Sequence, residues 1–310
     1  MSDFPYIVRN YRPSDFNDYV KLNIEAENAN PTGRCISPQV LSENLHRPNY
    51  SPEQDIFVVE MPGKIVGFIN IAPELKISRV ILDCLVHPEH RRKGLAKKLL
   101  EYAMHRAKEL KVKAVQVNII QDNEVAKKVL SRLSFKAVRR YLEFKLQLAE
   151  VQWSDTTHGT FILSHLKPGE DDKLTQLQNR CFTDTWGYNP NTTEEIAYSL
   201  KLSHCSPEDV VLIKEGNKPI GYCWSKIDYE TEIANGEKKG RIFMLGVDPD
   251  YRVKGIGKIA LMAGLAYLKN KGVRVVELDV DSENRAASAL YRSVGFKRWS
   301  SILWYEKAID

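Results

Sequence analysis

The chain has 310 residues, of which 43% are hydrophobic and 27% charged, so its composition is that of a globular protein long enough for two domains. The formal net charge of +5 at pH 7 is smaller than the basic excess expected of a nucleic-acid-binding protein. The five cysteines have no close pair and no histidine at metal-ligand spacing, which predicts free thiols in a reducing compartment and no metal site.

The opening residues predict no secretory signal. The segment MSDFPYIVRNYRPSD carries charges and a proline where a signal peptide needs an apolar core. No apolar run in the sequence approaches the ~20 residues that a membrane helix requires. We therefore expect a cytoplasmic protein with no membrane and no nucleic-acid partner.

The first half of the chain predicts strands interspersed with helices. An opening strand in YIVRNYRP precedes a helical stretch and two β-rich runs, which a glycine turn joins in VVEMPGKIVGFI. A third strand, RVILDCLV, leads into a basic glycine loop that starts at Arg91. The helix after this loop has apolar residues at helical spacing, namely Leu95, Leu99, Ala103, Ala107 and Leu110. A strand in AVQVNII, a short helix and closing strands complete this half.

The second half of the chain repeats this order. RVKGIGKIALMAG, from Arg252, resembles RRKGLAKKLLEYA, from Arg91, at an offset of 161 (252 − 91). The offset is 155 between the opening strands (161 − 6) and 154 between the β-rich runs (221 − 67). We therefore predict an α/β chain of two domains, residues 1–150 and 155–310, with the boundary in the polar stretch EVQWSDTTHGT.

The basic loop places cations where a helix begins. A helix N-terminus has unpaired N–H groups and a partial positive charge, so the nearest of Arg91, Arg92 and Lys93 are unfavourable there by ~0.3–1 kcal/mol each. A bound anion removes this conflict, and the small residues Gly94 and Ala96 let the backbone approach it closely. Solvated charges on an ordinary glycine turn remain the alternative.

Two other phosphate-binding motifs can be compared with this loop. A P-loop needs GxxxxGK followed by Ser or Thr, and the sequence has no such string. Gly255, Gly257 and Ala260 spell the GxGxxA of a dinucleotide fingerprint, with Glu277 about twenty residues further on. However, DPDYRVK separates the first glycine from its strand, and the chain ends too soon for a dinucleotide fold. The dinucleotide interpretation is therefore disfavoured.

These motifs resemble those of the GNAT superfamily of acetyl-CoA-dependent N-acetyltransferases. Its signature, Arg or Gln, two residues, Gly, one residue and Gly or Ala, is met by RRKGLA and by RVKGIG, each after a strand that ends in V-x-P. The downstream Asn, Ala, Tyr and Gly-Phe of the family are present in the second copy as Asn284, Ala287, Tyr291 and Gly295-Phe296. The similarity covers nearly the whole chain, and the two-domain layout resembles that of the mycothiol synthase family.

The resemblance implies the fold and the cofactor. The expected fold is α/β (α+β), with two tandem GNAT folds, each a mixed, largely antiparallel central sheet that is splayed at the CoA site and flanked by helices. Acetyl-CoA is the expected cosubstrate, with its pyrophosphate on the loop amides and its thioester carbonyl polarised by N–H groups of the preceding strand. In the second copy the residues expected to bind it are Leu245, Gly246, Val247, Arg252, Val253, Lys254, Gly255, Ile256, Gly257, Lys258 and Asn284. In the first copy they are Arg91, Arg92, Lys93, Gly94, Leu95 and Ala96.

The resemblance also assigns a catalytic role to Tyr291, which is expected to protonate the departing CoA thiolate. A tyrosine, with a reference pKa of ~10 against ~8.5 for a thiol, holds its proton at neutral pH and can donate it. Without the surrounding motif, Tyr291 would be interpreted as a core aromatic residue. The counterparts of Tyr291 and Gly295 in the first copy are Leu130 and Ser134. The first domain is therefore expected to be degenerate and the second catalytic.

The general base is not indicated by the motif. Mycothiol synthase-like enzymes carry a Glu early in the strand before the loop, where this sequence has Arg241. The base is then expected from Asp228, Glu230 or Glu232, or through water. Two functions stay open: an N-acetyltransferase that works by direct attack of an amine, and an inactive CoA-binding sensor or scaffold. The chain is expected to be a monomer or a homodimer.

The acceptor, a small-molecule or peptide amine, is expected near the segment CFTDTWGYNPNTTEE. Its candidate lining residues are Phe182, Asp184, Trp186, Tyr188, Glu194 and Glu195. The end of this segment also has the pattern of a helix start, and we favour a cap role for Thr192 or Thr193.

Overall fold

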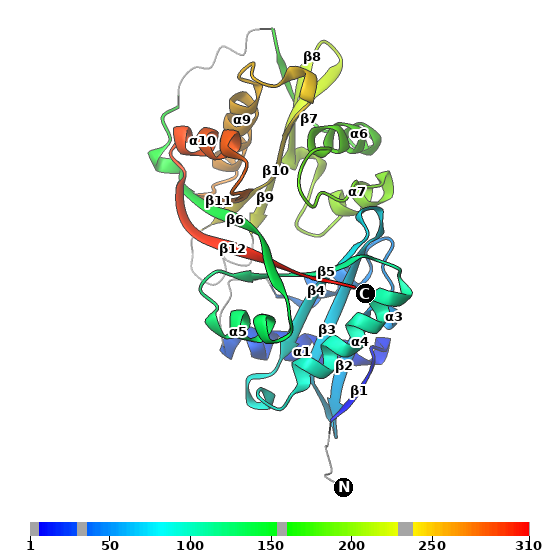
Figure 1. Cartoon of the computed structure of the whole chain (residues 1–310). Helices are drawn as coiled ribbons and strands as arrows, with labels where there is room; N and C mark the ends of the chain where they lie inside the picture. Colours follow the sequence, from blue (N-terminus) through cyan, green and yellow to red (C-terminus); the bar gives the residue numbers. More distant parts are fainter. Residues whose placement is uncertain (1–5, 30–35, 154–159, 229–237, 310) are drawn as a thin grey trace. The chain divides into compact units, whose positions relative to one another are not determined.

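The computed structural model describes residues 6–29, 36–153, 160–228 and 238–309, and the chain forms two compact units (Figure 1). Unit 1 is made of Met1–Arg139 and Leu303–Asp310, and unit 2 is made of Arg140–Ile302. Each unit has a mixed sheet with helices on both faces, so the alternation of strands and helices expected from the sequence is present in both.

The sheet of unit 1 is mostly antiparallel. Its strands lie in the order β1 (Ile7–Asn10), β2 (Ile56–Met61), β3 (Lys64–Glu74), β4 (Arg79–Val86) and β5 (Ala114–Ile120), followed by the end of β12 (Lys297–Ala308). Neighbours from β1 to β4 are antiparallel, whereas β4 and β5 are parallel. The helices are α1 (Phe16–Ala29), α2 (Pro38–Leu45), α3 (Pro52–Asp55), α4 (Leu95–Glu109) and α5 (Glu124–Arg132).

The sheet of unit 2 repeats this arrangement. After β12, its strands lie in the order β6 (Lys136–Gln147), β11 (Val275–Asp281), β10 (Lys239–Val247), β9 (Lys218–Asp228), β8 (Val210–Glu215) and β7 (Ile162–His165). The pair β10–β11 is parallel, and the other pairs from β6 to β7 are antiparallel. The helices are α6 (Asp171–Phe182), α7 (Thr193–Leu200), α9 (Ile256–Asn270) and α10 (Arg285–Val294).

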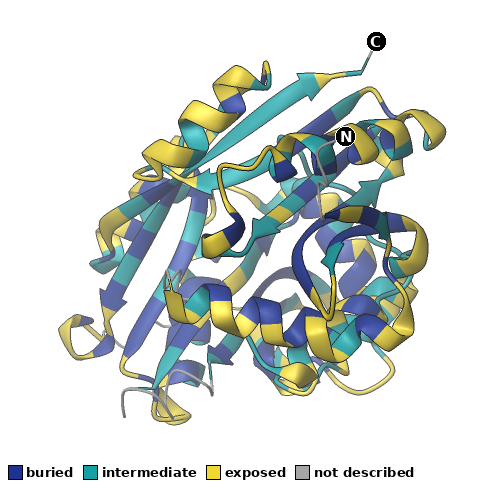
Figure 2. Ribbon diagram, turned by 90° about the horizontal axis from the view of Figure 1, so that it is seen from below, coloured by how far each residue is buried: buried dark blue, intermediate teal, exposed yellow. Residues whose placement is uncertain are grey.

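The middle of β9, residues 220–225, is buried on both faces of the sheet. Figure 2 colours the buried residues of the chain dark blue. Tyr222 and Trp224 of β9 pack in a cluster with α6 and α7, whereas Cys223 packs in the cluster that contains α9. Gly264 lets α9 approach β9 closely, because a Cβ there would lie 2.3 Å from Cys223 Sγ. Burying one Leu such as Leu265 stabilises the fold by roughly 1.5–3 kcal/mol. This packing sets where α9 begins, directly after the basic loop.

The two parallel strands of each unit separate after a short paired segment. In unit 2, only Lys239–Arg241 of β10 are in register with Val275–Glu277 of β11. β10 nevertheless stays paired with β9 as far as Val247, with an irregularity between Ile242 and Met244. In unit 1, only Arg79–Ile81 of β4 pair with β5. Each sheet is therefore splayed at the end that leads into a basic loop, as expected.

The compact units and the sequence copies differ at β6 and β12. Residues 140–147 of β6 belong to unit 2, where residues 141–147 pair with β11, and residues 303–308 of β12 belong to unit 1. In unit 1, Ile309 N donates to Lys113 O at 3.0 Å, next to the start of β5. The predicted domains, 1–150 and 155–310, refer to the copies in the sequence and stay a prediction.

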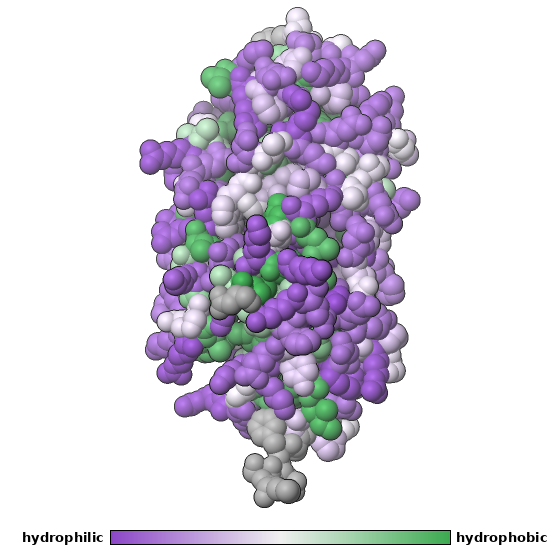
Figure 3. Space-filling view, turned by 45° about the vertical axis from the view of Figure 1, so that its right-hand side comes forward, coloured by the Kyte–Doolittle hydropathy of each residue, from purple (hydrophilic) through white to green (hydrophobic). Residues whose placement is uncertain are grey.

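Buried hydrophobic side chains form the cores of the individual units. The face drawn in Figure 3 is largely hydrophilic, in accord with a mean hydropathy of −0.37. Among the helices in the described part of the chain, none is long and apolar enough to cross a membrane.

Candidate functional site

A backbone with two left-handed residues connects β10 to α9 in unit 2. After the short 3-10 turn Pro249–Tyr251, Arg252 is extended, with φ −66° and ψ 162°. Val253 and Gly255 then have positive φ angles of 64° and 78°, and Gly255 is the N-cap of α9. Left-handed residues interleaved with other conformations turn successive N–H groups toward one side and form an anion-binding concavity.

Unit 1 has the same backbone before α4. Arg91 is extended, with φ −67° and ψ 165°, and Arg92 and Gly94 have φ angles of 64° and 79°. Arg92 and Val253 thus have the same left-handed backbone conformation at the second position of their loops. Because their side chains differ, the fold imposes this conformation.

The N–H groups of residues 253–257, in the unit 2 loop, have no acceptor among the described residues. The hydrogen bonds of this backbone resume at Lys258 and Ile259, which donate to Gly255 O at 3.0 and 3.2 Å. The groups of residues 253–257 are the unpaired donors of a helix N-terminus, where the helix dipole adds partial positive charge. The loop therefore offers a row of donors that could hold an anion such as a pyrophosphate.

The arginine that opens each loop uses its side chain within the protein. Arg252 Nη2 donates to Cys181 O at 2.8 Å, and its Nε donates to Val247 O at 3.4 Å. In unit 1, Arg91 Nε donates to Val86 O at 3.1 Å. Both arginines fasten the loop to the end of the preceding strand, so Arg252 can offer a ligand its backbone more readily than its guanidinium.

Replacing Val253 by asparagine is expected to stabilise the chain by about 1 kcal/mol, because a β-branched residue is strained at positive φ whereas asparagine tolerates it. Val253 is fully exposed, so the substitution removes no packing. Chemical denaturation measures the free energy of unfolding, with Val253→Ile, which keeps the branch and is expected to change nothing, as the control. Equal stability of the two variants would contradict strain at this position.

The end of β10 presents backbone donors to the splayed side of the sheet. Asp248 N donates to a carbonyl of β9 at 2.9 Å. Because the N–H groups of successive strand residues point to opposite edges, Gly246 also faces β9, and Leu245 and Val247 face the opening. Val247 O accepts from Arg252 on that side. Leu245 therefore offers an N–H group where the thioester carbonyl is expected.

Gly246 is explained by packing. A Cβ at this position would lie 2.6 Å from Tyr222 Cε1 and 2.8 Å from Cys181 Cβ. No side chain fits there without displacing α6 or β9, so this glycine keeps α6 close to the strand end.

Tyr291 lies in the core of unit 2, on α10. Its side chain is 7% exposed and its ring centroid is 6.3 Å from that of Phe144 and 5.8 Å from that of Phe296. Burial, with a smaller contribution from Cys223, raises the pKa of Tyr291, so its hydroxyl keeps its proton at neutral pH. None of the described residues accepts a hydrogen bond from this hydroxyl. Its position suits a core aromatic residue and a proton donor equally.

Asn284 has a structural task at the start of the same helix. Its Oδ1 accepts a hydrogen bond from Ala287 N at 3.0 Å and caps α10. In unit 1, Asn123 caps α5 through Ala126 N at 2.9 Å. The cap explains the Asn-x-x-Ala spacing and leaves the Asn284 amide N–H groups for a ligand.

An ion pair joins β10 to β11 where these strands begin to separate. Arg241, the last residue of β10 in register with β11, pairs with Asp279 of β11. Asp279 stands opposite Glu143 of β6. Burial raises the pKa of Asp279, although the Arg241 guanidinium opposes the rise, and burial also raises the pKa of Glu143. The start of the opening therefore holds a half-buried carboxylate that is more basic than a free aspartate.

The sequence interpretation missed Asp279. Among the predicted bases, Glu230 and Glu232 lie outside the described residues, and Asp228 is the last residue of β9. The signal that could have indicated Asp279 is the alternation of carboxylates with apolar residues in VVELDVD, which places the carboxylates on one face of the strand.

The segment between α6 and α7 crosses the splayed strands. α6 packs against β9 and β10, whereas the ring centroid of Trp186 lies 6.4 Å from that of Tyr141 on β6, beyond β11. Asn179 holds the segment in place, since its Oδ1 accepts from Tyr188 Oη at 2.8 Å and from Asn191 N at 2.9 Å. Two of the predicted acceptor residues, Trp186 and Tyr188, thus lie on a braced segment over the opening.

The predicted cap role of Thr192 is confirmed. Glu195 N donates to Thr192 Oγ1 at 3.2 Å, and Thr192 N donates to Glu195 Oε2 at 2.7 Å, which is a capping box at the start of α7. Glu195 is therefore engaged by the cap, and Asp184 and Glu194 are left as the carboxylates of the candidate acceptor lining.

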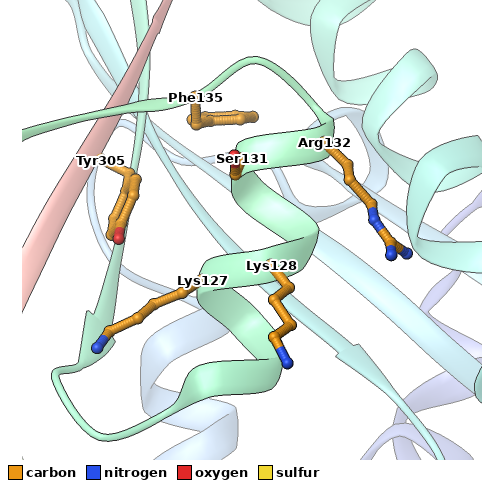
Figure 4. Close-up of a pocket in the computed structure, with 6 residues that line it drawn as sticks. All are labelled: Lys127, Lys128, Ser131, Arg132, Phe135 and Tyr305. Carbon is orange, nitrogen blue, oxygen red and sulfur yellow. The ribbon is translucent and has the colours of Figure 1, made fainter.

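Unit 1 has a basic pocket beside α5 (Figure 4). Its lining residues are Lys127, Lys128, Ser131, Arg132, Phe135 and Tyr305. The lining has no carboxylate, and its three cationic side chains extend in different directions in Figure 4. Leu130, the counterpart of Tyr291, is buried in the core of unit 1. The pocket can attract an anion, but it lacks a carboxylate base.

Both halves of the chain resemble known proteins. The Acetyltransferase (GNAT) family matches residues 25–135 and 172–296. A mycothiol acetyltransferase of Stackebrandtia nassauensis is 28% identical over 83% of this chain and 84% of its own length. A mycothiol acetyltransferase of Amycolatopsis mediterranei is 26% identical over 78% of this chain and 81% of its own length.

Two solved structures share the fold over the whole length. A GCN5-related N-acetyltransferase from Sphaerobacter thermophilus has a TM-score of 0.73 at 19% identity and covers 100% of this chain and 97% of its own. A tandem GNAT protein from the clavulanic acid biosynthesis pathway has a TM-score of 0.70 at 15% identity and covers 98% and 99%. These likenesses confirm the predicted fold class.

Proposed function

Since the chain belongs to the acetyltransferase (GNAT) family, we propose that unit 2 is the part that transfers an acetyl group from acetyl-CoA to a primary amine. The chain is an acetyl-CoA-dependent N-acetyltransferase, as the sequence predicted. The observation that carries the assignment to unit 2 is the difference between Tyr291 and Leu130, because these residues occupy equivalent positions and only tyrosine can donate a proton.

The backbone of unit 2 supports the binding of acetyl-CoA. The unpaired N–H groups of residues 253–257 would hold the pyrophosphate, with Lys254 and Lys258 adding positive charge. The N–H group of Leu245 faces the opening and would polarise the thioester carbonyl. Asn284 would contact the cofactor arm through the amide group that its cap role leaves available.

The proton steps need one donor and one acceptor. The amine nitrogen attacks the thioester carbon, the C–N bond forms and the C–S bond breaks, without a covalent enzyme intermediate. Tyr291 gives its proton to the CoA thiolate, and its raised pKa keeps that proton available at neutral pH. Asp279 accepts the proton that the amine loses, either directly or through water, and Arg241 holds its carboxylate at the start of the opening.

The acceptor that fits best is a small cationic amine. Trp186 and Tyr188 provide aromatic faces over the opening, and the ring of Phe182 stacks on Tyr188 at a centroid distance of 5.2 Å. Asp184 and Glu194 would attract a protonated amine to this side, and the amine gives this extra proton to solvent before its neutral nitrogen attacks. The relatives that align over most of their length are named mycothiol acetyltransferases, so an amine related to the mycothiol precursor is the first candidate.

A matched pair of variants tests which unit works. Gly255 and Gly94 have φ angles of 78° and 79°, and an added Cβ would meet nothing within 4 Å at either position. Gly255→Ala is expected to raise the KM for acetyl-CoA about tenfold, a loss of about 1.4 kcal/mol, because the Cβ enters the anion site. Gly94→Ala is expected to leave it unchanged. The assay measures thiol release from acetyl-CoA with a panel of amines. A raised KM for acetyl-CoA in Gly94→Ala but not in Gly255→Ala would overturn the proposal.

A further inference from the structure

Three potential metal-ligating side chains meet in unit 1, just before its basic loop, and a fourth lies beside one of them. Ligand atoms of His87, Glu89 and His90 all lie within 4.8 Å of one another. His87 Nε2 is also 3.6 Å from Glu25 Oε2 on α1. His90 is 8% exposed, whereas Glu89 is exposed to solvent. The cluster thus has a buried side and an open side.

The equivalent place in unit 2 holds an ion-pair network. Arg180 of α6 donates to both carboxylate oxygens of Asp248 at 2.9 Å and to Asp250 at 3.0 Å. α1 and α6 begin at an offset of 155 (171 − 16), the offset of the opening strands in the sequence. At the offsets of 155 and 161, the residues of unit 1 that correspond to Arg180, Asp248 and Asp250 are Glu25, His87 and Glu89. In both units, the helix is linked to the turn before the basic loop.

Unit 1 has no arginine at the position that corresponds to Arg180. A carboxylate, Glu25, replaces the guanidinium of Arg180, so two carboxylates now face two imidazoles. Lys21 Nζ is 3.9 Å from Glu25 Oε1, but it belongs to the same helix and does not bridge to the turn.

We propose that His87, Glu89 and His90, with Glu25 as a fourth ligand, bind a divalent transition-metal ion of the zinc class. Two imidazoles and one or two carboxylates are a typical ligand set for zinc. The ion occupies the place that the Arg180 guanidinium has in unit 2 and restores the link between α1 and the turn. This inference does not depend on which unit transfers acetyl groups.

The surroundings of His90 suit a metal ligand. Its Nδ1 is hydrogen-bonded to Tyr6 Oη at 2.9 Å, which fixes the ring and leaves Nε2 for a metal. Lys93 Nζ donates to the same Tyr6 oxygen at 2.9 Å. Tyr6 thereby couples the metal cluster to the basic loop, since Lys93 is part of that loop.

Calorimetric titration of the full chain with Zn²⁺, after treatment with a chelator, tests the proposal. We expect one Zn²⁺ per chain, and a higher unfolding temperature of the loaded protein. His87→Gln and Glu89→Gln are each expected to weaken binding by about tenfold or more. His105→Gln is the matched control, because His105 lies 3.1 Å from Glu109 on α4 with a side chain 79% exposed and is expected to bind no metal.

A double variant keeps the test independent of folding. Glu25→Arg with His87→Asp rebuilds the pair that unit 2 has, and it is expected to fold without metal and to bind no Zn²⁺. Zn²⁺ binding with undiminished affinity in this variant or in His87→Gln would overturn the proposal. The proposal would also be overturned if the heat of Zn²⁺ binding to the unmodified chain were no larger than that of His87→Gln.

Discussion

Tyr291→Phe is expected to lower kcat for acetyl transfer by about 10²–10⁴-fold, with little change in the KM for acetyl-CoA. Phenylalanine keeps the ring contacts with Phe144 and Phe296 but has no proton for the departing thiolate. Steady-state thiol release at a saturating amine concentration measures the effect. Unfolding curves of the variant are expected to match those of the parent, since the hydroxyl has no hydrogen-bond partner among the described residues.

Tyr222→Phe is the matched control for this variant. Tyr222 is fully buried in unit 2, and its hydroxyl is likewise unpaired within the described structure. At the offset of 154, unit 1 has Phe68 in its place. The control is expected to keep kcat, and removing an unsatisfied hydroxyl can relieve ~1–3 kcal/mol. Full activity of Tyr291→Phe, or an equal loss in both variants, would show that Tyr291 is not the proton donor.

Asp279→Asn is expected to reduce kcat/KM by about 10²–10⁴-fold, because asparagine keeps the shape of the side chain but does not accept a proton. The amide oxygen can still accept a hydrogen bond from Arg241, so the link between β10 and β11 is expected to persist. Initial rates at limiting amine concentration, together with thermal unfolding, separate lost chemistry from lost structure.

The pH dependence of this reaction has a definite sign. Burial raises the pKa of Asp279 above its ordinary value of 3.8, against the effect of Arg241. The base is ionised above that raised pKa, so the activity that needs it is present at higher pH and lost as the pH falls. The opposite holds for folding, because the stability from this carboxyl is present below 3.8 and lost as the pH rises through the raised pKa. In Asp279→Asn, the decrease of kcat/KM at low pH should reflect only the protonation of the amine acceptor.

Arg241→Gln provides the control for Asp279. Without the guanidinium, the pKa of Asp279 should rise further. The decrease of kcat/KM at low pH then begins at a higher pH, and the variant stays active above it. Unchanged activity of Asp279→Asn would show that Asp279 is not the base, and Lys226 would be the next candidate for that role. Its Nζ lies 3.6 Å from the ring centroid of Phe243, and burial lowers its pKa.

The parts of the site that follow from short motifs could be predicted. The loop from Arg252 to Gly257 and the Thr192 cap depend on the backbone conformations and hydrogen bonds of neighbouring residues. The residue types of these segments therefore indicate the loop conformation and the helix cap without knowledge of the rest of the fold. The prediction was incomplete for Arg252, because its carbonyl partners Val247 and Cys181 are determined by how the strand and α6 meet.

By itself, the sequence determined that this chain has two copies of one unit, a cation-rich loop in each, and a tyrosine in the second copy where the first has Leu130. Only the tertiary structure decided that Arg241 meets Asp279, 38 positions away, and that Glu25 meets His87. Period-two alternation assigns a strand residue to a face, but it does not specify the neighbouring strand or its register. These are set by the packing of the whole sheet and its helices, so contacts between distant carboxylates, imidazoles and guanidinium groups emerge only in the folded chain.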